Sequence, residues 1–117
     1  MGCLGFSKFT VSVVSHGHGA QLISLMHKLE ALCLLHIEHV VLTVNVPEPD
    51  LLVELNSQKW TFMLTIVQNL EPKGFGANHN AVFKHCNSEY LCVLNPDIDF
   101  SADPFPALIS RFDQPLV

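Results

Sequence analysis

The stretch FTVSVVSHGHG, residues 9–19, joins a run of β-branched and apolar residues to a glycine-rich end. Its first seven residues predict a buried strand, because β-branched side chains fit a covered, pleated surface. The HGHG that follows predicts a tight turn. Residues 20–35 then carry apolar side chains at helical spacing on one face. The chain therefore opens with a strand, a turn and a helix.

The same alternation continues to the carboxyl-terminal part of the chain. The patterns predict strands at residues 39–46, 62–69 and 89–95, helices at about 77–85 and from Asp103 onward, and a short helix or turn from Leu51. Near-continuous apolar strands separated by helices are typical of a mostly parallel sheet covered on both faces. We therefore expect an α/β, Rossmann-like fold that forms a single domain over residues 1–117.

Composition narrows the classes of function. Hydrophobic residues make up 49% of the chain and charged residues 15%, so the sequence can form a substantial core. A net charge of −5 without a cluster of Lys or Arg argues against nucleic-acid binding. Apolar runs fall short of the about 18 residues that span a bilayer, and MGCLGFSKFT lacks the apolar region of a signal peptide. We expect no membrane span and a cytoplasmic location.

The polar and glycine-rich segments all follow predicted strands. In a parallel sheet with helices on both faces, ligands bind outside the carboxyl ends of the strands. The candidate binding residues at that edge are Ser15, His16 and Gly17 after the first strand, Asn45 after the second, Gly74, Gly76 and Asn80 after the third, and Asn95, Asp97 and Asp99 after the fourth. Their convergence on one edge predicts a ligand site there.

Two of these segments suggest specific chemistry. Gly74 and Gly76 would let a ligand approach the backbone closely, although ordinary turn glycines give the same pattern. The segment does not match the dinucleotide fingerprint G-x-G-x-x-G, because His79 stands at the third glycine position. Asp97 and Asp99 could share a divalent cation, Mg or Mn, that in turn holds a diphosphate. An acidic turn after a strand is the alternative interpretation.

Three motifs together resemble a known family. FTVSVVSHG, KGFGANHNAVF and YLCVLNPDI, in this order and over about residues 9–110, resemble the amino-terminal half of glycosyltransferase family 2, particularly its rhamnosyltransferase-like members. The resemblance implies a GT-A type fold, truncated here, that binds a nucleotide-diphospho-sugar with a divalent cation. It places residues 15–17 near the base, Asn45 near an acidic or amide position, and Gly74, Gly76 and Asn80 along the nucleotide pocket. Asn95 and Asp97 match the ends of the metal-binding D-x-D, with Asp99 one step outside it.

The resemblance also has implications for the acceptor pocket and the general base. The family's carboxyl-terminal half supplies the acceptor pocket and the general base of inverting transfer, and we expect both to be missing from this chain. Whether the chain is an enzyme is therefore open at this point. Two hypotheses follow: a glycosyltransferase-type domain that binds the donor sugar nucleotide, or a catalytically incomplete binding or assembly module that forms homo-oligomers through an exposed edge strand and apolar face. An unrelated doubly wound domain would remain only if the helix after Gly76 were absent.

Overall fold

A computed structural model describes residues 9–32, 36–86, 88, 90–98 and 105 of the chain. Strands and helices alternate through these residues, as the sequence predicts. The elements are β1 (Phe9–Ser15), α1 (Gly19–Leu32), β2 (Ile37–Val44), α2 (Pro49–Asn56), β3 (Met63–Gln68), α3 (Phe75–Phe83) and β4 (Tyr90–Leu94). The predicted α/β class is confirmed, and α3 supplies the helix after the glycine-rich turn.

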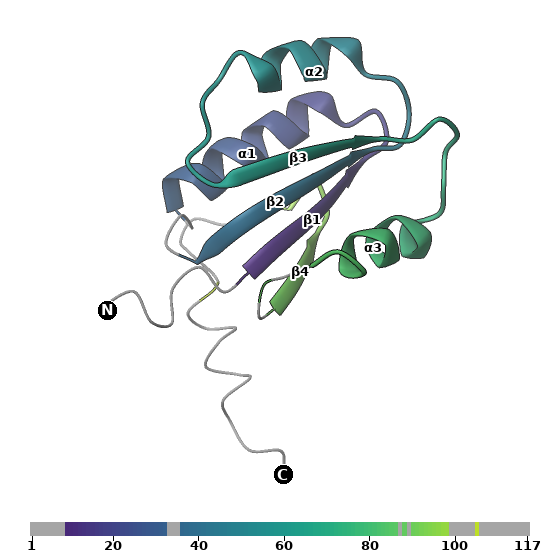
Figure 1. The fold of residues 1–117 in the computed structure, drawn as a ribbon. Coiled ribbons are helices and arrows are strands. Elements are labelled where there is room, and N and C mark those ends of the chain that lie inside the picture. Colours follow the sequence, from purple (N-terminus) through teal and green to yellow (C-terminus); the bar gives the residue numbers. More distant parts are fainter. Residues whose placement is uncertain (1–8, 33–35, 87, 89, 99–104, 106–117) are drawn as a thin grey trace.

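The four strands form one sheet in the order β3-β2-β1-β4, and every pair is parallel. The chain therefore steps outward from β1 to β2 and β3, and then returns to the other side of β1 to form β4 (Figure 1). This reversal creates a topological switch point between β1 and β4. In open α/β sheets the crevice beyond the carboxyl ends of such strands is where ligands bind.

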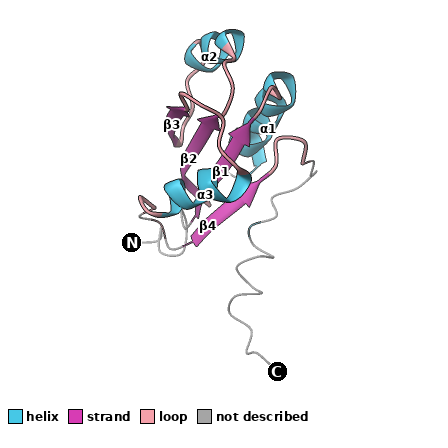
Figure 2. Cartoon of the chain, turned by 90° about the vertical axis from the view of Figure 1, so that its right-hand side faces the viewer, coloured by secondary structure: helices cyan, strands magenta, loops and turns pink. Residues whose placement is uncertain are grey.

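Helices cover the two faces of the sheet unequally. The hydrophobic core lies between one face and helices α1 and α2, and joins Val11 and Val13 of β1 to Leu25 of α1 and Leu55 of α2. Helix α3 lies on the opposite face, beside β1 and β4 (Figure 2). The predicted cover on both faces is confirmed, but within the described residues the second face has a helix over only part of its width.

The helix boundaries differ in small ways from the predicted ones. The segment from Leu51 is a helix that begins at Pro49, because proline has the φ angle of a first helical residue and needs no hydrogen bond there. Helix α3 begins at Phe75, two residues earlier than predicted, so Gly76 lies inside it. The helix predicted from Asp103 lies outside the described residues, apart from Phe105. Phe105 is buried against Phe9, with the ring centroids 4.4 Å apart.

None of the helices in the described ranges is long and apolar enough to cross a membrane. Strand β1 is buried along nearly its whole length, as expected for a central strand, whereas alternate residues of the edge strand β3 are exposed.

Candidate functional site

A cavity of about 370 Å³ lies at the carboxyl-terminal edge of the sheet, at the switch point between β1 and β4. We call it the edge cavity. Its lining comes from four parts of the chain that are distant in sequence: Val14, His16 and His18 around the end of β1, Asn45 after β2, Pro72, Lys73, Phe75, Asn78 and His79 around the start of α3, and Leu94, Asn95 and Pro96 at the end of β4. The volume falls within the range of about 300–1,000 Å³ typical of small-molecule sites.

The turn after β1 is held in place by Glu48, which precedes α2. The Ser15 hydroxyl donates to Glu48 Oε2 at 2.6 Å, and the Gly17 backbone N–H donates to the same oxygen at 3.1 Å. Gly17 has φ = 81°, a conformation that glycine adopts without strain. A Cβ at Gly19 would lie 3.3 Å from Glu48 Oε1, so glycine there leaves room for the carboxylate. Ser15 and Gly17 therefore position the turn that carries His16 and His18 to the cavity.

Asn45 is the centre of a hydrogen-bond network beneath the edge cavity, and its side chain is 5% exposed. Its Oδ1 accepts from Lys73 N and Asn69 Nδ2, both at 2.8 Å. Its Nδ2 donates to Lys73 O at 2.9 Å and lies 3.1 Å from His16 Nδ1. The amide of Asn45 thus pairs with both backbone groups of Lys73 and fixes the start of the loop into α3.

The same network continues into α3. Asn78, 2% exposed, accepts from Asn69 Nδ2 at 2.8 Å and donates to Lys73 O at 3.2 Å. Gly74 precedes the helix and no side chain caps its amino terminus. The first backbone N–H groups of a helix have no partner within it and carry the positive end of the helix dipole. The fixed loop therefore places Lys73 and an uncapped helix start beside the edge cavity.

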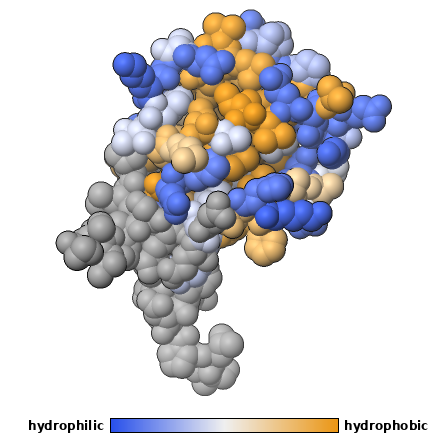
Figure 3. Space-filling model, viewed as in Figure 1, coloured by the Kyte–Doolittle hydropathy of each residue, from blue (hydrophilic) through white to orange (hydrophobic). Residues whose placement is uncertain are grey.

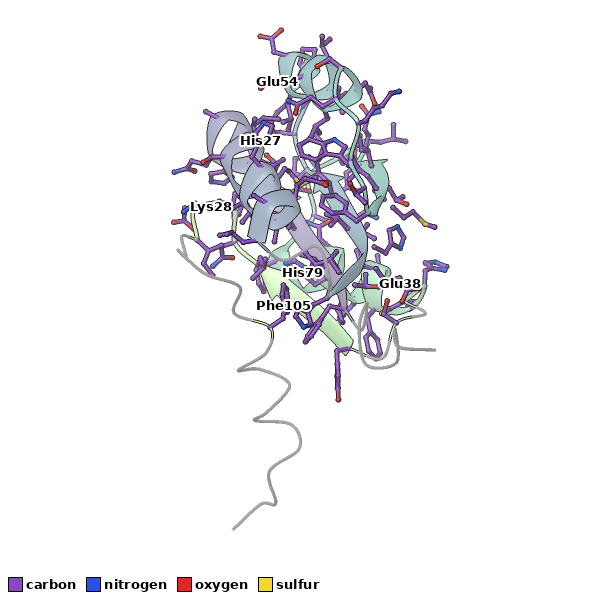
Figure 4. All side chains as sticks on the ribbon, turned by 90° about the vertical axis from the view of Figure 1, so that its left-hand side faces the viewer. His27, Lys28, Glu38, Glu54, His79 and Phe105 are labelled. Atoms are coloured by element: carbon purple, nitrogen blue, oxygen red, sulfur yellow. The ribbon has the colours of Figure 1, made fainter. Side chains whose placement is uncertain are left out.

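His79 forms part of the buried wall of the cavity. The imidazole is 6% exposed, and Nδ1 lies 2.8 Å from the hydroxyl oxygen of Ser12 on β1. Burial lowers the pKa of His79, which keeps the ring neutral at physiological pH. The ring stands edge-on to Phe75, with the centroids 4.4 Å apart. Figure 4 labels His79 within the body of the protein, whereas Glu54 lies on α2 at its periphery.

Charge around the cavity is one-sided. Lys73 and three histidines line it, and none of the described lining residues is an aspartate or glutamate. This contrasts with the net charge of −5 for the whole chain. A cavity with a lysine, an uncapped helix start and amide groups, but no described carboxylate, favours anionic or uncharged polar ligands over cationic ones.

The structure brings together three of the predicted binding residues, since His16, Asn45 and Asn95 all line the edge cavity. Ser15 and Gly17 lie behind its wall and bond to Glu48. Other predicted residues lie around the start of α3 but do not line the cavity. These are Gly74, Gly76 and the exposed Asn80. Apart from the glycines' own chain neighbours and helix backbone, no atom of the described residues lies within 4 Å of a Cβ built at Gly74 or Gly76, so that space is open to solvent or a ligand.

Of the two aspartates of the predicted cation site, the structure describes one. Asp97 is exposed and lies in a neighbouring groove beside α1, with Gln21 and Lys28, while Pro96 borders both this groove and the edge cavity. Asp99 lies outside the described residues. No group of three or more His, Cys, Asp or Glu side chains gathers in the described ranges. Mg²⁺ commonly binds through one or two carboxylates plus waters and ligand phosphates.

Several residues of the site were not among the predicted ones. Lys73, Phe75, Asn78 and His79 line the cavity, and Glu48 supports it. The four lining residues fall within the KGFGANHNAVF motif, whereas Glu48 lies outside every segment singled out in the sequence. What the sequence did not show was which side of α3 faces the sheet.

Comparison with known proteins adds no assignment. No family model matches this sequence, and a search of curated proteins finds no significant match. The likeness to glycosyltransferase family 2 therefore rests on the three short motifs alone.

Proposed function

We propose that this chain is a nucleotide-sugar-binding domain of the glycosyltransferase type, and that the edge cavity holds the nucleoside diphosphate part of the donor. The observation that carries the proposal is the position and lining of this cavity. It lies at the switch point of a parallel sheet, beside Lys73 and an uncapped helix start, with no described carboxylate in its wall. These features suit a polar, negatively charged ligand.

The cation belongs to the same proposal. Asp97 lies next to the cavity, across Pro96, and offers one carboxylate. A single carboxylate holds Mg or Mn well when the ligand's phosphate oxygens and water complete the coordination. We therefore expect the cation to bind together with the nucleotide rather than before it. Transfer of the sugar would further require an acceptor site and a general base, so the proposal for this chain is donor binding.

Calorimetric titration with nucleoside diphosphates and their sugars, with Mn present and then chelated, tests this proposal. Wild-type protein should bind at least one of them, and chelation should weaken that binding. Asp97→Asn should remove the effect of Mn. Glu54→Gln is the matched control, because Glu54 is an exposed carboxylate on α2, away from the cavity (Figure 4).

Each outcome has a separate meaning. Absence of binding by every compound in the panel would refute the proposed function. Binding that is equal with and without Mn, and equal in Asp97→Asn, would refute the role of the cation while donor binding stands.

A second candidate function, a non-catalytic assembly module, is favoured by the part of the sheet that none of the described helices covers. Beside α3, a groove of about 670 Å³ crosses the face of β2 and β3 and includes Val41 and Val67. Met63 and Val67 on edge strand β3 are 64% and 39% exposed. Figure 3 shows hydrophobic residues gathered on this side of the molecule. A second copy of the chain would bury this apolar surface.

Light scattering after gel filtration tests the assembly function. A mass of two chains that falls to one chain in Val67→Lys would support it. A single-chain mass for the wild type at high concentration would refute it.

A further inference from the structure

One buried polar atom near the edge cavity has no partner among the described residues. Nε2 of His79 is shielded from solvent, and none of the described residues forms a hydrogen bond with it. The side chain is 6% exposed and lines the cavity. Buried polar atoms are nearly always paired, because an unpaired one loses its bonds to water without replacing them. The exception belongs to a residue that lines the edge cavity, so a ligand that displaces the atoms now covering Nε2 can supply the partner.

The hydrogen bond on the other side of the ring determines what this atom offers. Ser12 is fully buried, and its hydroxyl has one hydrogen to donate. The described partner of that hydroxyl is His79 Nδ1, at 2.8 Å. If Nδ1 carried a proton, the hydroxyl hydrogen of Ser12 would be left without an acceptor. Ser12 therefore donates, Nδ1 accepts, and the neutral ring carries its proton on Nε2.

The surroundings of Nε2–H distinguish two parts of the cavity. Lys73, His16 and Asn95 are exposed and form its rim, whereas His79, Leu94 and Pro96 are buried and form its floor. Asn45 and Asn78 are also buried in the lining, but their amide nitrogens already donate to the Lys73 carbonyl oxygen. A phosphate on this floor would therefore lose its hydration and meet one uncharged donor without a described partner. At the rim it would meet the lysine and the start of α3. The floor is thus better suited to an uncharged acceptor.

We propose that His79 is a specificity-determining residue, whose Nε2–H donates a hydrogen bond to a carbonyl oxygen of the ligand on the floor of the edge cavity. If the ligand is a sugar nucleotide, the carbonyl belongs either to the nucleobase or to an N-acetyl group of the sugar. This assignment of the carbonyl rests on the proposed function. Ligands without a carbonyl leave Nε2–H unpaired and bind more weakly, because a buried unpaired donor is unfavourable.

The test begins with nitrogen-15 NMR of the histidine rings in the ligand-free protein, which should show His79 with its proton on Nε2. Inosine and adenosine are then titrated as a matched pair that differs by one carbonyl on the base. N-acetylglucosamine and glucose form the second pair, and uridine is a further carbonyl probe. At least one carbonyl compound should shift the Nε2–H resonance, and its partner without the carbonyl should bind roughly tenfold more weakly or not at all.

Two variants separate recognition from folding. The double variant Ser12→Ala, His79→Phe replaces the buried pair with apolar groups of similar shape, which is close to neutral for stability. It should unfold no more easily than the wild type, yet bind the carbonyl probe roughly tenfold more weakly. His27→Phe, which changes an exposed histidine on α1, should leave binding unchanged.

A proton on Nδ1 of His79, or an Nε2–H resonance that no carbonyl probe shifts, would overturn the inference. Equal affinity of wild type and double variant for a bound carbonyl probe would overturn it as well. The proposed function fails separately. If a carbonyl probe engages Nε2–H but no sugar nucleotide binds in calorimetry, the inference stands and the proposed function does not. If a sugar nucleotide binds without affecting Nε2–H, the proposed function stands and the inference does not.

Discussion

Replacing Asn45 with aspartate keeps the shape of the side chain and removes its two donated hydrogen bonds. In the wild type, Nδ2 faces the carbonyl oxygen of Lys73 at 2.9 Å and His16 Nδ1 at 3.1 Å. A carboxylate cannot donate to either. Each lost bond is worth about 1 kcal/mol, and a charge buried against a carbonyl oxygen adds about 1–2 kcal/mol. We expect Asn45→Asp to lower the free energy of unfolding by roughly 3 kcal/mol at pH 7.

Acid should partly restore the stability of this variant. Burial and the nearby carbonyl oxygen raise the pKa of an aspartate at this position in the folded state. The folded protein then binds a proton more readily than the unfolded chain, so the variant gains stability relative to wild type as the pH falls through that raised pKa. A protonated carboxyl group can donate to the carbonyl of Lys73, as the amide does.

Urea denaturation followed by the fluorescence of Trp60 measures both effects. Trp60 is partly buried and stacked on Phe62, with the centroids 5.8 Å apart, so unfolding should change its emission. The control is Asn80→Asp, which makes the same change at an exposed position of α3. If Asn45→Asp matches the wild type at pH 7, or its deficit is constant from pH 4 to 8, the donating role of Asn45 is refuted.

Three further outcomes follow from the geometry. Gly17→Ala should lower the free energy of unfolding, measured by urea denaturation, by about 1 kcal/mol, because φ is 81° at this position. The control variant Gly74→Ala should show no comparable loss, because φ is −70° there. Burial lowers the pKa of His79 in the folded protein. The stability from its neutral ring should therefore be complete above the pKa of about 6.5 in the unfolded chain and should decrease as the pH falls below that value. In thermal melts, the double variant Ser12→Ala, His79→Phe should show a smaller decrease over the same pH range. Glu48→Ala should destabilise the Ser15 turn by about 1–2 kcal/mol, measured by the same melts, and an unchanged melting temperature would contradict the bonds to Glu48.

The sequence was sufficient for the order of the elements because each strand and helix carries a local signal. The β-branched run Phe9–Ser15 and the helical spacing of the segment after it depend on neighbours only a few positions away. The predicted convergence on one edge also follows from local signals, since parallel strands share a direction. His16, Asn45 and Asn95 accordingly meet at the edge cavity.

The remaining features of the site depend on contacts that are distant in sequence. Ser12 and His79 are 67 residues apart, and Ser15 and Glu48 are 33 apart. Such pairs follow from how α3 and the loop before α2 pack on the sheet, which periodicity does not specify. For Asp97 the sequence motif predicted a place in the site, but the turn at the end of β4 places the residue in the groove beside α1 instead.

The unequal faces of the sheet explain how the chain can keep, in its interior, a polar atom that has no partner among the described residues. The face toward α1 and α2 is wholly apolar at its centre, with Val11 and Val13 fully buried. The face toward α3 buries polar groups instead, including Thr10, Ser12 and His79. Stability from the first face allows the second to retain a group that helps binding more than folding. If this division is correct, Val13→Ala should lower the free energy of unfolding by about 1–3 kcal/mol and leave the affinity of the folded protein for a carbonyl ligand unchanged. The double variant Ser12→Ala, His79→Phe should instead keep its stability and lose affinity for that ligand.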